Sequence, residues 1–278
     1  ASVPQDYFKQ LDSAASDAVA AIFRFQHMPG EEQHCDTATA LYELRLHHYV
    51  LGLEYAGSPY AHHTLGSCIA IRANAYVQVR GFPKRAGAED FYILNKLAKI
   101  GPISRLSGQC IQLQSRHSSR VPFGTGPAVA AIIAAGQPED VRIFDHPRCF
   151  EALRALLASL PELSQSPDVA LAPLFVRQGL DATVAEQSDG ALQAMGIRSG
   201  LAHCQRQSKS SAQFQRQFHQ WFDAFRTLKF IHSMRDAGWK QQSLTQLDAL
   251  QPNLWTAVMP PPYSLEQLRG GLLRLNHD

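Results

Sequence analysis

Residues 65–101 read LGSCIAIRANAYVQVRGFPKRAGAEDFYILNKLAKIG. The pattern predicts three elements in series: a strand over 65–72, a short helix leading into a turn over 73–82, and a second helix over 89–101. Apolar residues recur at helical spacing in the second helix, and Gly101 is a natural C-cap for it. Two adjacent carboxylates, Glu89 and Asp90, therefore stand at a helix entrance, behind a glycine-containing loop.

The same alternation of strands and helices extends on both sides of this stretch. It predicts a buried strand over 18–27, a helix over 38–57 and a strand over 105–114. Beyond residue 125 the apolar residues follow helical spacing, as in Phe214, Phe218, Trp221, Phe225 and Leu228. We therefore expect an α/β layer over residues 1–125 and a mainly helical region over 126–278.

Composition limits the class of protein. The chain has 278 residues, of which 45% are hydrophobic and 18% charged, with a net charge of +2. It has no signal peptide and no run of about 18 apolar residues, the length that would span a bilayer. Its five cysteines form no C-x-x-C pair, which is typical of a reducing compartment. We expect a cytoplasmic protein with no nucleic acid as partner.

The carboxylate pair has two interpretations. Acidic residues are common in the first turn of a helix, where they complement the helix dipole and cap free N–H groups. The order of the surrounding elements favours a second interpretation. A strand from Gly66 to Arg72 is followed by a short helix, the turn Arg80-Gly81-Phe82 and then the E-D pair. This order resembles the acceptor half of a family 2-like glycosyltransferase of the GT-A fold, with Arg80 in place of the usual first glycine of the turn.

The resemblance covers residues 1–126 and implies roles for the loop and the pair. Asp90 would be the catalytic base that takes the proton from an acceptor hydroxyl, as an inverting transferase requires. Glu89 would orient the acceptor or support Asp90. Gly87 would let the loop bend and close over the substrate.

The nucleotide-sugar half of such an enzyme is missing from the sequence. That half carries an Asp-x-Asp motif that positions Mg²⁺ or Mn²⁺ on the donor diphosphate, and this sequence contains no D-x-D. We expect the chain to be the C-terminal portion of a longer enzyme, inactive by itself, with the main metal ligands outside it. The resemblance implies that Arg116 or Arg120 neutralises phosphate oxygens and that His117 is a further metal ligand.

The loop before the first quoted strand supplies further candidates. In the resemblance it borders the acceptor site, so His62 and His63 are predicted to contact substrate and Tyr60 to stack on a sugar ring. The alternative is a surface loop without a role.

A second hypothesis assigns no catalysis. The stretch 202–240 holds seven Lys or Arg residues against two Asp, together with the aromatic stripe given above. A degenerate transferase-like module could use such a helical region to dock on a partner or on a membrane surface. The stripe alone is more typical of a helix that packs into a core. Peripheral contact with a membrane is therefore the alternative to a purely cytoplasmic location.

Overall fold

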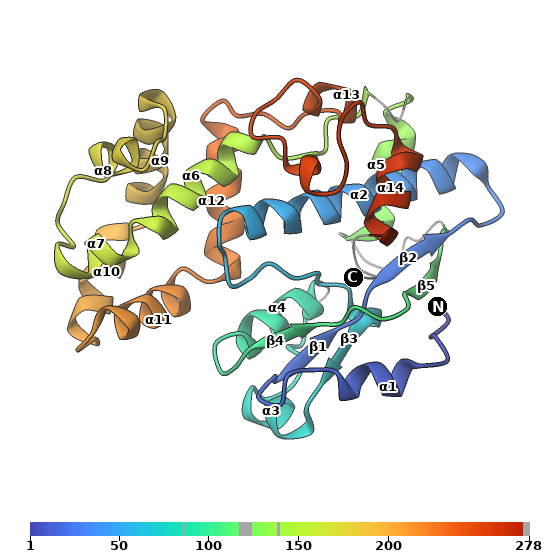
Figure 1. The fold of residues 1–278 in the computed structure, drawn as a ribbon, viewed down its shortest axis with the longest axis horizontal. Coiled ribbons are helices and arrows are strands. Elements are labelled where there is room, and N and C mark those ends of the chain that lie inside the picture. Colours follow the sequence, from blue (N-terminus) through green and yellow to red (C-terminus); the bar gives the residue numbers. More distant parts are fainter. Residues whose placement is uncertain (86, 117–123, 138–139, 275–278) are drawn as a thin grey trace.

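The computed structural model describes residues 1–85, 87–116, 124–137 and 140–274. Strands are confined to the first part of the chain, and helices make up the rest (Figure 1). The strands are β1 (Ala20–Ile22), β2 (Phe25–Met28), β3 (Ile69–Ile71), β4 (Ile103–Arg105) and β5 (Ile111–Gln114). An α/β layer followed by a helical region is what the sequence predicts.

Helices of the α/β layer alternate with the strands. They are α1 (Tyr7–Asp12), α2 (Gln33–Tyr55), the 3₁₀ turn η1 (Gly66–Cys68), α3 (Ala73–Gln78) and α4 (Glu89–Leu97). The helices that follow are α5 (Thr125–Ala134), α6 (Pro147–Ala158), α7 (Leu160–Gln165), α8 (Leu171–Arg177), α9 (Ala182–Ala194), α10 (Ile197–Arg206), α11 (Ser211–Trp221), α12 (Ala224–Asp236), α13 (Leu244–Leu247), the 3₁₀ turn η3 (Leu254–Ala257) and α14 (Leu265–Arg274). None of the helices in the described ranges combines the length and apolar character needed to cross a membrane.

The strands form two small sheets. In the first, β1 lies between β3, which is antiparallel to it, and β4, which is parallel, with Ala21 opposite both Ala70 and Ser104. In the second, β2 and β5 run parallel, with Phe25 opposite Ile111. The predicted strand over 18–27 is therefore wrong as a single element, because it divides between two sheets.

The division occurs at Phe23 and Arg24. The Phe23 ring is buried and stacks on Tyr7 at 4.3 Å between ring centroids, and its amide donates to the Cys68 carbonyl just before β3. The Arg24 guanidinium donates to the carbonyl oxygens of Gly108, at 3.2 Å, and of Leu273, at 3.0 Å. The predicted strand over 105–114 divides in the same way, into β4 and β5.

Two predictions about helix ends are corrected. Helix α4 ends at Leu97, four residues before Gly101. A Cβ on Gly101 would lie 2.4 Å from a methyl carbon of Val19, so close packing rather than capping requires glycine there. The predicted aromatic stripe is broken between α11 and α12, where Asp223 caps α12 by accepting from the Arg226 amide, and Phe225 is 36% exposed.

Helix α2 connects the two parts of the molecule. It lies beside β2 on one side and the C-terminal helices on the other (Figure 1). Leu41 and Leu44, near its middle, pack with buried residues of α5 and α14, whereas Leu53, near its end, packs with Phe150 and Leu153 of α6. The core packing therefore crosses residue 125, the predicted boundary.

Candidate functional site

The turn before α4 has an unusual backbone. Arg80 and Gly81 both have left-handed conformations, with φ of 61° and 63°, and the Gly81 amide donates to the Tyr76 carbonyl at 2.9 Å. Glycine adopts this conformation without strain, whereas arginine seldom does. The chain thus keeps at Arg80 the backbone shape that a glycine at that position would favour.

Asp90 lies in the first turn of α4 and its carboxylate is held by two backbone amides. Oδ1 accepts from the Phe91 N–H at 2.7 Å, and Oδ2 accepts from the Gly66 N–H at 3.0 Å. Ala88 occupies the N-cap position of α4, but Asp90 satisfies the free Phe91 N–H of the first turn, as the capping interpretation expects. The bond to Gly66 fixes the helix entrance against the start of β3, which lies 24 residues earlier.

Burial and hydrogen bonding act in opposite directions on this carboxyl group. Burial raises the pKa of Asp90, the Phe91 and Gly66 amides lower it, the nearby Glu89 charge raises it, and the net pKa is raised. The amide of Asp90 itself is a third backbone donor that lowers the pKa, and a carboxylate with about four lone-pair sites still has one left. The group can therefore still receive a proton.

One residue that the sequence did not single out, Tyr42, interacts electrostatically with Asp90. Tyr42 is buried on α2, and burial raises the pKa of its hydroxyl. The Arg45 charge and a hydrogen bond with Thr125 lower that pKa, and the Asp90 charge raises it. The charge of Asp90 is therefore felt by a side chain of α2, which no local sequence pattern reveals.

The other predicted site residues on this side of the fold take separate positions. Glu89 is exposed beside Asp90, and Gly87 is buried just before α4. Arg116 is exposed at the end of β5. His117 and Arg120 lie outside the described residues.

Tyr60, His62 and His63 come together at a small cavity beside α4. They line a cavity of about 50 Å³ between α2, α4 and α12, together with Phe91 and Asn95. Ligand pockets usually measure roughly 300–1,000 Å³, so this cavity is too small for a sugar. Burial lowers the pKa of both His62 and His63 to about 4, so both rings are neutral at pH 7.

Tyr60 does not offer a ring face to a ligand. Its side chain is 4% exposed, and its hydroxyl donates to the His219 carbonyl of α11. The prediction that Tyr60 stacks on a sugar is therefore not supported, and the interpretation of this segment as a surface loop is wrong. The helical region covers the segment.

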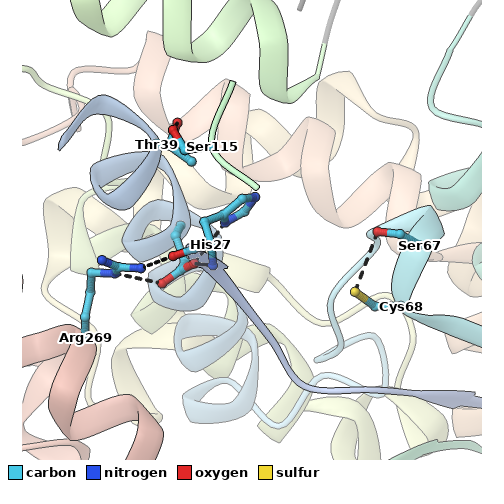
Figure 2. Close-up of polar contacts among 7 residues, drawn as sticks. His27, Thr39, Ser67, Cys68, Ser115 and Arg269 are labelled. Atoms are coloured by element: carbon cyan, nitrogen blue, oxygen red, sulfur yellow. Dashed lines mark hydrogen bonds and ion pairs between the residues drawn. The ribbon is translucent and has the colours of Figure 1, made fainter. Parts of the chain in front are cut away.

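A buried polar network supports the end of β2. The Glu43 carboxylate of α2 accepts from the His27 amide at 2.6 Å, contacts the His27 ring at 2.9 Å, and accepts from the Arg269 Nε of α14 at 3.0 Å (Figure 2). Burial by itself raises the pKa of Glu43, but its hydrogen bonds with His27 and the Arg269 charge outweigh burial and leave the pKa lowered. The network fastens β2, α2 and α14 together.

A second contact places the end of β5. The Ser115 hydroxyl donates to Thr39 Oγ1 of α2 at 3.0 Å (Figure 2). The backbone of Arg116, the next residue, therefore lies close to α2. Across the described ranges no group of three or more His, Cys, Asp or Glu side chains is arranged to hold a metal ion.

Comparison of the chain with protein-family models, with curated proteins and with solved structures found no match.

Proposed function

We propose that this chain is the acceptor side of a GT-A-type glycosyltransferase. It would move a sugar from a nucleotide-sugar donor to an acceptor hydroxyl with inversion at the anomeric carbon. The observation that carries the proposal is the position of Asp90, in the first turn of α4 and tied to Gly66 at the start of the preceding strand unit.

Asp90 has the properties that a general base needs. Burial raises the pKa of Asp90, which makes the ionised carboxylate a better proton acceptor than that of an exposed aspartate. The acceptor oxygen would attack the anomeric carbon as its proton passes to Asp90. The bond from that carbon to the donor diphosphate would break, and its electron pair would leave with the nucleotide diphosphate. Glu89 is assigned to orienting the acceptor.

The proposal assigns the donor half to an unpaired edge of the first sheet. Within the described ranges β3 pairs with β1 alone, so its other edge is open to another strand. Because β3 runs away from Gly66, a strand antiparallel to it would bring its carboxyl end to Gly66 and thus to Asp90. We place there the donor-binding half, supplied by another part of the same polypeptide.

The divalent cation of this proposal, Mg²⁺ or Mn²⁺, is held mainly by that donor half. The described residues do not form a cation site by themselves, so the ion would be bound by residues outside them. Arg116 is assigned to the donor diphosphate, whose oxygens suit a guanidinium group. The same role for Arg120 and a ligand role for His117 rest on the sequence alone.

The test uses a polypeptide that joins this chain to the coding segment upstream of Ala1. Release of nucleotide diphosphate is measured with a panel of nucleotide sugars and Mn²⁺. Replacing Asp90 with Asn should lower the rate about 10²- to 10⁴-fold, the usual contribution of a general base. Glu186→Gln, an exposed change on α9, should leave the rate unchanged. Equal rates for Asp90→Asn and the unmodified polypeptide would exclude Asp90 as the base.

A non-catalytic module is the second candidate. It is favoured by the small cavity beside Tyr60, His62 and His63, which leaves these predicted acceptor contacts without room for a sugar. In that case the joined polypeptide would release no nucleotide from any donor, with either Mg²⁺ or Mn²⁺. Donor turnover would reject this candidate.

A further inference from the structure

Exposed aromatic and basic side chains meet over α3, α4 and α12. We call this the aromatic–basic surface, and it comprises Tyr76, Phe82, Arg85, Tyr92, Phe225 and Lys229. Three of its rings are well exposed: Phe82 at 43%, Tyr76 at 39% and Phe225 at 36%. Side chains of this size are usually buried, so their gathering on one surface calls for an explanation.

Contacts connect neighbouring elements of this surface, and the Lys96 ammonium of α4 donates to the Val79 carbonyl just after α3 at 3.1 Å. The Tyr76 and Phe82 rings lie 5.9 Å apart, and the Tyr92 ring of α4 lies 6.1 Å from the Phe225 ring of α12. Lys99, two residues after the end of α4, donates to Asp223, the cap of α12, at 2.5 Å and so links the two helices. Figure 1 shows α4 close to both α3 and the start of α12.

The charge of this surface is positive. Segments 76–96 and 221–229 carry six Lys or Arg residues against three carboxylates. Two of those carboxylates are already engaged: Asp90 by two amides, and Asp223 by Lys99 and Asn95. Glu89 is the remaining one. A surface of this kind attracts an anionic partner.

The cations lie directly over the rings. The Arg85 guanidinium carbon is 3.9 Å from the centre of the Tyr92 ring, and the Lys229 ammonium is 4.8 Å from the centre of the Phe225 ring. A nucleic-acid platform needs open ring faces on which bases can stack, and the Arg85 contact covers a face of Tyr92. Apolar bodies combined with cationic tips suit the boundary between lipid headgroups and acyl chains.

We propose that the aromatic–basic surface docks on an anionic phospholipid membrane. Arg85 and Lys229 would bind lipid phosphates, while Phe82, Tyr76 and Phe225 would enter the headgroup layer. This inference does not depend on the glycosyltransferase proposal. It also moves the expected membrane contact from the stretch 202–240 as a whole to the start of α12, the turn before α4 and α3.

The test is sedimentation of this chain with vesicles of phosphatidylcholine, with and without phosphatidylserine. Binding to the anionic vesicles is expected, and it should weaken as salt rises. The double variant Arg85→Gln/Lys229→Gln should bind roughly 25-fold more weakly, because each cation near an anionic membrane contributes roughly fivefold. The control Lys9→Gln/Lys209→Gln removes the same charge from exposed positions elsewhere and should bind like the unmodified chain.

A second pair of variants tests the rings without changing charge. Phe82→Ser/Phe225→Ser should weaken binding to anionic vesicles, whereas Phe8→Ser, at a ring 79% exposed on α1, should not. Circular dichroism checks that each variant is folded. Three results would overturn the proposal: no preference for anionic over neutral vesicles, an equal loss in the surface and control variants, or tighter binding to a single-stranded oligonucleotide than to anionic vesicles.

Discussion

At the scale of single residues, the buried carboxylate of Glu43 explains how a charged group can sit in the interior. Glu43 is 3% exposed, yet it faces an amide, an imidazole and a guanidinium, so its negative charge is well compensated. Removing one partner of this network would cost more stability than the paired interaction contributes, because the charge of the other partner would stay buried without compensation. The fold therefore depends on the whole network rather than on one bond.

Replacing Glu43 with Gln should lower the free energy of unfolding by about 2–4 kcal/mol at pH 7, since an amide cannot accept from all of these donors. The pKa of Glu43 is lowered in the folded chain, so its contribution is present above the unfolded pKa and is lost as pH falls through the folded pKa. The difference from the unmodified chain should thus shrink below pH 4.5. Denaturant unfolding at several pH values measures it, with Glu186→Gln as the exposed control; a difference that persists at acid pH contradicts it.

Asp90 should show the opposite dependence on pH. Its pKa is raised in the fold, so its contribution to stability is present below the unfolded pKa and is lost as pH rises through the folded pKa. As a base, however, it works only when ionised. The transfer rate of the joined polypeptide should fall as pH drops through this raised pKa, and the pH profile of kcat/KM measures it. A profile that stays flat down to the pKa of an ordinary aspartate, near 3.8, would contradict it.

At the scale of elements, the sequence pattern predicted those features of the fold that depend on contacts between residues close together in the sequence. The order of β3, α3, the turn and α4 follows from apolar spacing and glycines within one short stretch. The break at Phe23 and Arg24 depends on Tyr7 and on the end of α14, so no window around residue 23 contains its cause. The same holds for the candidate site, because Tyr42, whose hydroxyl interacts electrostatically with Asp90, lies on α2, far from residue 90 in the sequence.

Gly52 illustrates the close approach of two helices. A Cβ on Gly52 of α2 would meet the Phe150 ring of α6 at 2.4 Å, whereas Gly190 of α9 has nothing within 4 Å. Alanine favours a helix over glycine by about 1 kcal/mol, so Gly190→Ala should stabilise the chain by up to that amount. Gly52→Ala should instead destabilise it by about 1–3 kcal/mol through overpacking. Thermal unfolding of the two variants tests this, and a gain in stability for Gly52→Ala would contradict the described packing.

At the scale of the whole molecule, α2 joins the α/β layer and the helical region into one folded unit. Its first half lies in a core with α5 and α14, and its last turns lie in a core with α6 and the helices beyond it. Neither core is complete without α2. The chemistry predicted from the α/β layer therefore depends on helices far along the chain.

A single unfolding transition should follow. All three tryptophans, Trp221, Trp239 and Trp255, report on the helical region, whereas buried Cys68 reports on the α/β layer. Tryptophan fluorescence and labelling of Cys68, read by mass spectrometry, should give the same denaturant midpoint. Two separate midpoints would show that the parts unfold independently.

The fastening of α14 by Arg24 and Arg269 has a practical consequence for anyone trimming the chain for crystallisation. Cutting before residue 265 removes the guanidinium that compensates Glu43 and leaves Arg24 without the Leu273 carbonyl. It also uncovers Leu41 and Leu44, which pack with Leu268 of α14. A shortened product of this kind should accumulate in inclusion bodies, so attempts to reduce the chain to its α/β layer need to retain the last helix or replace its apolar face.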